Sequence, residues 1–583
     1  MRQRATMRPR KTTPQRRGGV SRVLAMIAVL AMVLAACADA DTDDLDEILD
    51  DEEPAEEDEA DADPDLDAEP DDTPDDADGS TFIYAVDGVP DTLDMWTTYQ
   101  GDPSRFWGYG VQSKLVNYDT SGLTDQGCEQ LAEVTDLTGE LAESWEFDED
   151  ENAWIFTLRE GVQSPDGNTM TAEDVKWSFD RAQETSNVVR FLMFDVADYT
   201  EDPFEVVDDQ TLMIRVNEQT ALDVAILTWH QFMVFDTEEV RSHATDDDPW
   251  ANEWLIENWA NFGPWQLDRF DPGNEIVHTQ NPNYWNADNR GDVETYILRS
   301  IDESSTRVQL LQTGEIDVTQ RVAFDQFESL QDADGVEVRS CVSPNRDDLM
   351  PNHDDPALGD PLVRQALSLA IDREVLAEGP YRGFGDPSRT GLPDFYDFPE
   401  PELELEHDPD RARELLAEAG AEDLSFTLTI SPSRPGAHAE PVAVLLQSMW
   451  ADIGVDVDLE VIAGAAEFSD RFFDSEYQMM MYNNNPAVAD PFYSLNLHST
   501  TVSFQNTHNY DSPAYDELTL FIGRTEPGPE RDEAMVEVSD LIVEDLPVID
   551  FVDRRYVTAW VEGWGNYNAR PHGEIFPSEL VRN

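Results

Sequence analysis

The stretch from residue 426 to residue 461 decides the fold class: Phe426–Ile430 reads FTLTI, Glu440–Asp452 reads EPVAVLLQSMWAD, and Val455–Val461 reads VDVDLEV. The first segment has the composition of a strand, and the second carries apolar residues at helical spacing. In the third segment apolar residues alternate with acidic ones, which is typical of a strand with one face in water. A strand, a helix and a strand in this order form a βαβ unit with a right-handed crossover. The sequence therefore predicts an α/β fold.

Two helices are predicted just before this unit. Asp360 is followed by a proline and starts a helix that Gly379 can end, and Asp408, also followed by a proline, starts a shorter helix that ends at Gly420. Aspartate caps a helix N-terminus, proline suits the first helical position, and glycine suits the residue after the last turn.

Earlier in the chain the pattern changes to strands. Ser144–Phe147 and Trp154–Leu158 predict a pair of strands joined by a polar turn. Thr171 and Asp174 then have the spacing of a capping box, which predicts a helix start. The buried face of this helix is expected to hold the apolar residues that recur at helical spacing, namely Val175, Phe179 and Ala182.

The N-terminal 37 residues have the pattern of an export signal. Arginines come first, and an apolar run from Val23 to Ala36 follows. This run is shorter than the ~20 residues that a membrane-spanning helix needs. Leu34-Ala35-Ala36-Cys37 resembles the bacterial lipobox. We therefore expect residues 1–37 to be a lipoprotein signal peptide that ends at a lipidated Cys37, with plain cleavage as the alternative.

Residues 38–80 consist almost wholly of Asp, Glu, Ala and Pro. Such a segment cannot offset its ordering entropy and repels itself, so we expect a disordered acidic tether.

The charge of the whole chain excludes one class of partner. Its 583 residues include 125 acidic and 37 basic ones, a formal net charge of -88, which repels nucleic acid. Only three of the basic residues are lysines. A surface so rich in carboxylates suggests the hypothesis of a high-salt habitat, where self-repulsion is screened.

Besides Cys37 the chain has two cysteines, Cys128 and Cys341. Because an exported protein meets an oxidising compartment, a disulfide between them is possible, and a bond between different lobes would restrict hinge motion.

No catalytic signature is found. The sequence lacks a P-loop, a His-Glu-x-x-His motif and a Gly-x-Ser-x-Gly motif. His353-Asp354-Asp355 could touch a metal ion, but no second His or Cys stands at ligand spacing, so a solvated loop is the simpler interpretation. We expect no catalytic residue, no cofactor and no metal site.

A series of motifs carries a family resemblance. Its segments are Leu141–Glu146, Leu158–Val162, Thr171–Val175, Phe262–Leu267, Asp271–Gly273, Asn281–Trp285, Leu310–Asp317, Val363–Leu367 and Ala370–Arg373. They occur in this order over nearly the whole chain from Phe82 onward, and they resemble the family 5 extracellular solute-binding proteins, the receptors of peptide and nickel ABC importers.

The resemblance implies a periplasmic-binding-protein type II-like fold, with two lobes joined by hinge strands and an extra inserted subdomain. The main lobe would comprise residues 81–117, 258–335 and 554–583. The inserted subdomain would be residues 118–257, and the second lobe residues 336–553. These boundaries carry a margin of ~10 residues.

The resemblance also suggests where the ligand binds. In this family several ligand contacts come from the loop after a Met/Tyr-rich strand, which here implicates Tyr482, Asn483, Asn484 and Asp490. Peptide-binding relatives commonly place an Asp for the ligand's α-amino group where this chain has Ala487. A buried ammonium without a countercharge costs several kcal/mol, so this departure argues against that particular clamp.

Each candidate has a structural alternative. Asp490 could instead cap the helix that follows it. Trp96 and Tyr99, just after the first strand, could form aromatic walls of the site or could simply pack in a core.

The function implied is that of a binding protein, not an enzyme. A monomeric lipoprotein on the outer face of the cell membrane would capture an oligopeptide or peptide-like solute and deliver it to ABC permease subunits. One alternative is a carrier for an oligosaccharide or another uncharged polar solute, which Ala487 favours. A second is a secreted hydrolase without a recognisable motif, and nickel chelates are a minor option.

Overall fold

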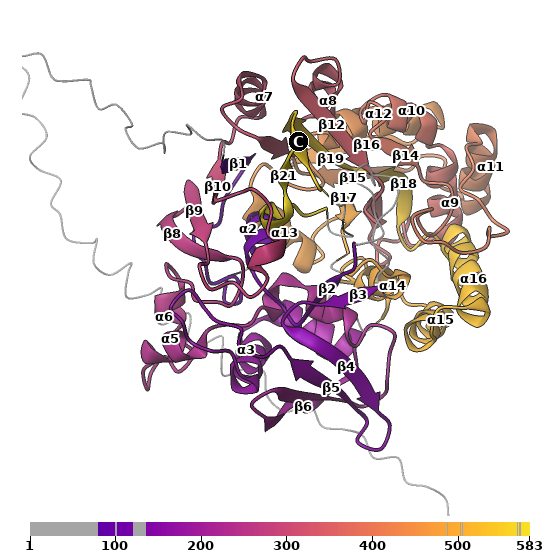
Figure 1. The fold of residues 1–583 in the computed structure, drawn as a ribbon. Coiled ribbons are helices and arrows are strands. Elements are labelled where there is room, and N and C mark those ends of the chain that lie inside the picture. Colours follow the sequence, from indigo (N-terminus) through magenta and orange to yellow (C-terminus); the bar gives the residue numbers. More distant parts are fainter. Residues whose placement is uncertain are drawn as a thin grey trace, which may run out of the picture. The chain divides into compact units, whose positions relative to one another are not determined.

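The computed structural model describes residues 80–98, 102–120, 136–486, 488–501, 503, 505–567, 570 and 573–583 (Figure 1). The predictions for the signal peptide, Cys37, the acidic tether up to residue 79, Tyr99 and Cys128 lie outside these residues. Within the described residues, no helix combines the length and the apolar character that crossing a bilayer requires.

The first lobe is built on a seven-stranded sheet. Its strands, in spatial order, are β12 (Val336–Cys341), β19 (Tyr556–Val561), β11 (Val318–Gln320), β1 (Thr81–Val86), β10 (Thr295–Ser300), β9 (Glu275–Gln280) and β8 (Trp265–Asp271).

Both faces of the central strand β1 are covered, which explains its continuous apolar sequence. Phe82 and Tyr84 point into one apolar cluster, where Phe82 contacts the ring of Trp560. Ile83 and Ala85 belong to the opposite cluster, beneath α7 (Ser304–Thr313) and α8 (Phe324–Leu330). The strand β1 runs parallel to both of its neighbours, β10 and β11, so the ends of β1 and β11 open onto the same edge of the sheet.

The strand β12 extends the sheet of the first lobe to Cys341, because it pairs with β19 along its whole length. This end lies within the margin of ~10 residues around the expected boundary at residue 335, and the lobe boundaries stay predictions.

The inserted part contains a four-stranded antiparallel sheet. Its strands, in spatial order, are β4 (Ala142–Asp148), β5 (Ala153–Leu158), β7 (Thr211–Val216) and β6 (Tyr199–Asp208). The predicted pair of strands is confirmed as β4 and β5, with Trp145 opposite Phe156.

The predicted helix is α3 (Ala172–Thr185), where Asp174 accepts a hydrogen bond from the Thr171 backbone N–H at 2.7 Å. Its predicted apolar face, Val175, Phe179 and Ala182, is fully buried.

The second lobe is built on a six-stranded sheet. Its strands, in spatial order, are β14 (Gly385–Pro387), β18 (Ile549–Arg554), β13 (Arg346–Pro351), β17 (Met479–Asn484), β15 (Ser425–Ile430) and β16 (Asp456–Val461). The predicted βαβ unit is confirmed: β15 and β16 are parallel, with Phe426 opposite Val457, and α12 (Ala439–Asp452) connects them.

The prediction of a single helix between Asp360 and Gly379 is wrong, because the segment forms two helices. The first, α9 (Pro361–Leu369), starts at the Asp360 cap as predicted. It ends before Asp372, whose side chain accepts from the Val375 N–H and starts α10 (Arg373–Glu378). The helix predicted after Asp408 is α11 (Pro409–Ala419), and Gly420 ends it in the left-handed conformation.

The described part of the chain forms eight further α-helices. They are α2 (Asp102–Val111), α4 (Asn187–Phe191), α5 (Thr237–Ser242), α6 (Asn252–Leu255), α13 (Ala465–Phe473), α14 (Pro491–Ser499), α15 (Pro513–Arg524) and α16 (Pro529–Asp545). Short strand pairs complete the fold: β2 (Val116–Tyr118) with β3 (Leu137–Gly139), and β20 (Trp564–Gly565) with β21 (Val581–Arg582).

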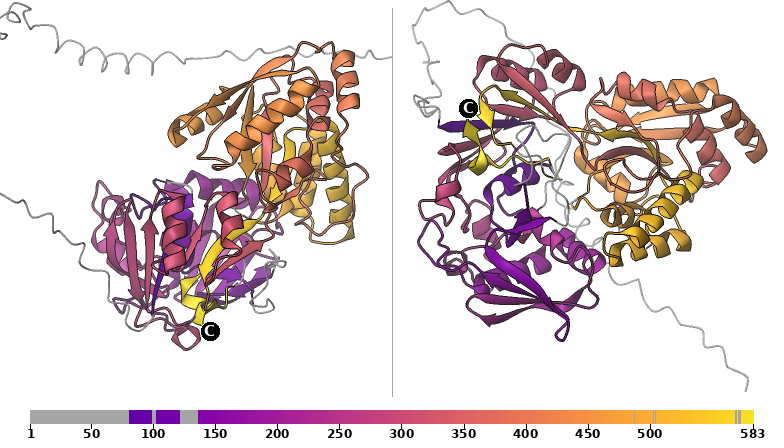
Figure 2. Two further views of the ribbon diagram at one scale, coloured as in Figure 1. Left: turned by 90° about the horizontal axis from the view of Figure 1, so that it is seen from above. Right: turned by 45° about the vertical axis from the view of Figure 1, so that its right-hand side comes forward.

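The chain crosses between the two large sheets at two adjacent places (Figure 2). One crossing joins β12 to β13, and the other joins β18 to β19. They are bonded to each other, because Ser343 Oγ donates to the Arg554 carbonyl at 2.6 Å and the Arg554 N–H donates to the Asn345 carbonyl at 2.9 Å. The two crossings therefore form a paired hinge.

Candidate ligand pocket

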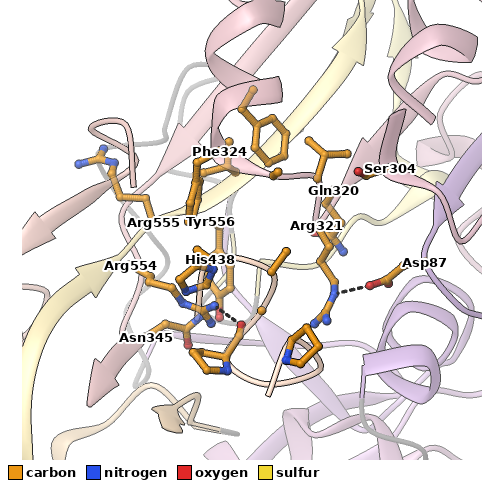
Figure 3. Close-up of a pocket in the computed structure, with 18 of the residues that line it drawn as sticks. Asp87, Ser304, Gln320, Arg321, Phe324, Asn345, His438, Arg554, Arg555 and Tyr556 are labelled. Atoms are coloured by element: carbon orange, nitrogen blue, oxygen red, sulfur yellow. Dashed lines mark hydrogen bonds and ion pairs between the residues drawn. The ribbon is translucent and has the colours of Figure 1, made fainter. Parts of the chain in front are cut away.

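A cavity of about 1010 Å³ is lined by residues of both lobes (Figure 3). This volume is at the upper end of the range for small-molecule pockets, ~300–1,000 Å³. The residues that line it come from several segments that are far apart in the sequence, and the hinge contributes Asn345, Arg554, Arg555 and Tyr556.

On the first lobe the cavity lies at the carboxyl ends of parallel strands. Asp87 follows β1, and Arg321 follows β11. These two side chains form an ion pair with 3.0 Å between Arg321 Nε and Asp87 Oδ2. The buried Arg307 donates to the Arg321 carbonyl at 2.9 Å, which fixes the loop.

The second lobe contributes the same kind of edge. The strand β15 runs parallel to β17, and the segments after them carry His438 and Asn485 into the lining. Carboxyl ends of parallel strands are where α/β sheets commonly bind ligands. Two such edges thus flank one cavity.

A buried carboxylate orients two of the groups that line the pocket. Asp347, on β13, is fully buried and accepts from the Tyr381 hydroxyl at 2.5 Å. Its oxygens also lie 2.8 Å from His438 Nε2 and 3.2 Å from Arg554 Nε. Burial alone would raise the pKa of Asp347, but Arg554 and His438, together with the Tyr381 hydrogen bond, lower it below its usual value. An ionised Asp347 therefore holds His438 and Arg554 at the cavity wall.

A second group of polar residues surrounds Tyr556. Burial raises the pKa of Tyr556, and the nearby guanidinium groups of Arg105 and Arg554 oppose this shift. Arg105 Nη2 also lies 3.6 Å from a carboxylate oxygen of Glu574, which is only 8% exposed. Both charge signs are thus present at this wall.

Arginine is concentrated at the pocket. The six arginines that line it are Arg105, Arg307, Arg321, Arg382, Arg554 and Arg555. The five acidic residues that line it are Asp87, Asp302, Asp325, Glu440 and Glu574. In a chain with more than three acidic residues for each basic one, this balance is unusual, and guanidinium groups can bind carboxylates in a bidentate manner.

Two of the predicted site residues, Trp96 and Asp490, lie away from the cavity. Trp96 is buried in the first lobe, where its Nε1 donates to the Gln231 carbonyl at 2.8 Å and its ring lies 4.9 Å from that of Phe235. Asp490 caps α14 through the Phe492 N–H at 2.9 Å and accepts from Arg531 at 2.6 and 2.7 Å. Neither residue lines the cavity. The structural alternatives, core packing and helix capping, describe their observed contacts.

Tyr482, Asn483 and Asn484, at the end of β17, do not line the cavity either. The ring of Tyr482 stacks on that of Phe472, with 4.4 Å between the ring centroids, and Arg434 Cζ lies 3.9 Å from the centroid of the Tyr482 ring. Arg434 Nε donates to Asn483 Oδ1 at 2.6 Å. Asn484 is the last residue of β17, and the residue after it, Asn485, enters the pocket lining.

The polar groups at the hinge were not predicted. Arg105, Arg554, His438 and Glu574 stand in four separate segments, and none is part of a recognisable motif. Only the pairing of the two crossings brings them together. The nearest signal in the sequence was the segment around Ala487, where the family's Asp is missing. Ala487 lies outside the described residues, but Asn485, two residues earlier, lines the cavity.

Cys341 is disulfide-bonded. The chain's two other cysteines, Cys37 and Cys128, lie outside the described residues, so the pairing with Cys128 stays a prediction.

In the part of the chain that the structure describes, no cluster of three or more His, Cys, Asp or Glu side chains could hold a metal ion. His353 Nε2 lies 3.0 Å from the Pro547 carbonyl.

Comparisons with known proteins agree with this architecture. Residues 136–506 match the model of a family described as bacterial extracellular solute-binding proteins, family 5 Middle. The probable D,D-dipeptide-binding periplasmic protein DdpA of Escherichia coli (strain K12) is 25% identical over 475 residues, which cover 81% of this chain and 88% of that protein.

Two solved structures have the same fold. The ABC transporter-associated periplasmic binding protein DppA from Helicobacter pylori, in complex with peptide STSA, gives a TM-score of 0.73 at 21% identity and covers 86% of this chain and 98% of its own. The dipeptide binding protein from Pseudoalteromonas sp. SM9913, in complex with Met-Leu, gives a TM-score of 0.73 at 20% identity. This match covers 86% of this chain and 100% of that protein's chain. These similarities confirm the predicted α/β fold of two hinged lobes with an inserted subdomain.

Proposed function

Because the chain belongs to the bacterial extracellular solute-binding proteins of family 5, we propose that it captures a peptide or peptide-like solute between its lobes and delivers it to an ABC permease. The family consists of binding proteins of transporters, so the proposed task is capture and release without chemical change. Closure follows when a ligand contacts both lobes and thereby stabilises the closed state over the open one.

The observation that carries this proposal is the shared cavity. Groups from the first lobe, such as Arg105 and Gln320, and from the second, such as His438 and Asn485, line one space of about 1010 Å³. Arginines there suit a carboxylate, and amide side chains suit the peptide groups of a ligand. The names of the relatives, which bind dipeptides and other short peptides, support the same class of ligand.

A thermal-shift panel tests the proposal. The chain without residues 1–36 is heated with di-, tri- and pentapeptides and with oligosaccharides, and its melting temperature (Tm) is compared with the unliganded value. A ligand at 100 times its Kd stabilises the folded state by about 2.7 kcal/mol. We expect peptides to raise Tm and oligosaccharides to leave it unchanged.

Other outcomes of the panel would contradict the proposal. A shift with oligosaccharides alone would favour the alternative of an uncharged polar solute. Mass spectrometry of the ligands after prolonged incubation addresses the enzyme alternative, since a hydrolase would leave shorter products.

We also propose an extracytoplasmic location with a lipid anchor at Cys37. Expressed in a bacterium with a lipoprotein pathway, the wild-type chain should partition with membranes, and Cys37→Ser should be released in soluble form. The mass of the mature N-terminal peptide gives a direct check, because a lipidated Cys37 adds acyl chains to it. An unmodified Cys37 in the mature chain would refute the anchor.

A further inference from the structure

Glu574 stands out among the buried carboxylates of the first lobe. It lines the cavity, is 8% exposed, and neither of its two oxygens has a hydrogen-bond partner among the residues that the structure describes. Arg105 forms an ion pair with it, but Arg105 Nη2 lies 3.6 Å from the carboxylate oxygen, beyond hydrogen-bond distance.

The local backbone explains why the side chain is held there. Gly573, just before it, has a φ of +68°, a left-handed conformation that favours glycine. A Cβ at this position would lie 2.6 Å from the Tyr556 ring, so only glycine permits this close approach. The segment is therefore fixed against the hinge, with Glu574 at the pocket wall.

Other buried carboxylates of the protein show what is missing at Glu574. Asp347 has Tyr381, His438 and Arg554 within 3.2 Å, and Asp490 receives two bonds from Arg531. Burying a carboxylate without hydrogen bonds is costly, so such a group either loses its charge or acquires donors. In the cavity, the donors can come from a ligand.

A second acceptor on the opposite lobe points to the same ligand chemistry. Asn485 lines the cavity from the end of β17, and its Oδ1 has no hydrogen-bond partner among the described residues. The cavity thus offers acceptors from both lobes to N–H donors of a bound molecule.

We propose that Glu574 binds a cationic nitrogen of the ligand, which in a peptide is the free α-amino group. The N–H groups of the ammonium donate to the Glu574 carboxylate, and the arginines of the same cavity remain for the ligand's carboxylate. The ligand class is therefore a zwitterion with a primary amine. This inference rests on the proposed function and names the residue that supplies the charge absent at Ala487.

The test uses the tripeptide with the largest Tm shift in the panel above, together with its N-acetylated form. Calorimetric affinities are measured for the wild-type chain, for Glu574→Gln and for the control Glu579→Gln. Glu579 lies in the same C-terminal segment and is paired with Arg570, but it does not line the cavity. Both substitutions remove one negative charge.

We expect acetylation to weaken binding to the wild-type chain and to Glu579→Gln by about tenfold or more. Glu574→Gln should bind the free peptide more weakly by a similar factor and should no longer distinguish it from the acetylated form. Glu574→Asp, which keeps the charge, should restore part of the discrimination.

Two results would overturn the inference: equal affinity of the wild-type chain for free and acetylated peptide, or discrimination by Glu574→Gln as strong as that of the wild type. If Glu574→Gln fails to fold, the acetylation series on the wild-type chain and on Glu574→Asp still decides. Failure of the proposed function looks different, since no peptide would then raise the Tm of the wild-type chain.

Discussion

At the scale of single residues, the pocket depends on side chains that do not touch its interior. Asp347 is absent from the lining, yet it holds His438 and Arg554, which are part of it. The low pKa of Asp347 means that its contribution to stability is present above the unfolded value of ~3.9 and is lost as the pH falls through the lower folded value. This contact is therefore fully formed at neutral pH.

Removing this charge should harm both stability and binding. Asp347→Asn leaves Arg554 and His438 without their anion, and breaking a buried pair costs about 3–5 kcal/mol. We expect a lower free energy of unfolding in urea and weaker peptide binding. The control is Asp354→Asn, an exposed position in the same lobe, which should change stability by less than about 0.5 kcal/mol. An unchanged unfolding midpoint for Asp347→Asn would contradict this assignment.

Asp223, far from the pocket, should give the opposite pH dependence. Burial raises its pKa to about 7, although Thr220 and Trp154 donate hydrogen bonds to it. The folded state therefore holds a proton that the unfolded state, with a pKa of ~3.9, has lost between pH 4 and 7. The stability from this group is fully present below pH ~4 and is lost as the pH rises through about 7.

The measurement compares urea midpoints of the wild-type chain and Asp223→Asn from pH 4 to pH 7.5. The wild-type chain should lose on the order of 3 kcal/mol over this range relative to the variant. The exposed variant Asp209→Asn should follow the wild-type curve. Parallel curves for Asp223→Asn and the wild-type chain would show that the group does not titrate in this window.

At the scale of helices and strands, local patterns in the sequence were sufficient where one element has one buried face. The alternation of Val457 and Leu459 with acidic residues identified β16, and the turn between Trp145 and Phe156 identified a hairpin. The helix after Asp360 was predicted too long, because the second cap at Asp372 interrupts an apolar pattern that continues across it. Caps decide such boundaries, and a periodic pattern does not show them.

The contact between α14 and α15 offers a test at this scale. Gly523 lies within α15, and a Cβ there would come 2.6 Å from the ring of Phe492 on α14. Alanine favours a helix over glycine by about 1 kcal/mol, but overpacking a core costs about 1–3 kcal/mol. We therefore expect Gly523→Ala to lower Tm, whereas Glu517→Ala, on the exposed side of α15, should leave it nearly unchanged. A higher Tm for Gly523→Ala would show that the two helices can separate at little cost.

At the scale of the whole molecule, sequence motifs predicted the fold but not the polar groups of the pocket. The family motifs lie mainly within lobes, where packing constrains them. The pocket collects Arg105, His438, Arg554 and Glu574 from distant segments, and only the tertiary fold defines which arginine of an acidic chain faces a ligand. Of the segment that begins at Asn483, Asn485 lines the cavity, and the role of Asn483 and Asn484 in ligand binding stays a prediction.

The net charge leads to a prediction about salt. With a formal charge of -88, carboxylate repulsion opposes compactness, and salt shortens the range of this repulsion from about 10 Å at 0.1 M to about 3 Å at 1 M. We expect the Tm of the chain without residues 1–80 to rise steeply with potassium chloride up to molar concentration. A Tm that is indifferent to salt would refute the high-salt hypothesis, and sucrose at matched osmolality serves as the control for general exclusion effects.

Arg554 is at once the last residue of β18, a partner of Ser343 and Asn345 across the paired crossings, and a wall of the cavity. A ligand that binds the Arg554 guanidinium therefore contacts the hinge between the two lobes directly. A change in the angle between the lobes would therefore also move this ligand-facing group.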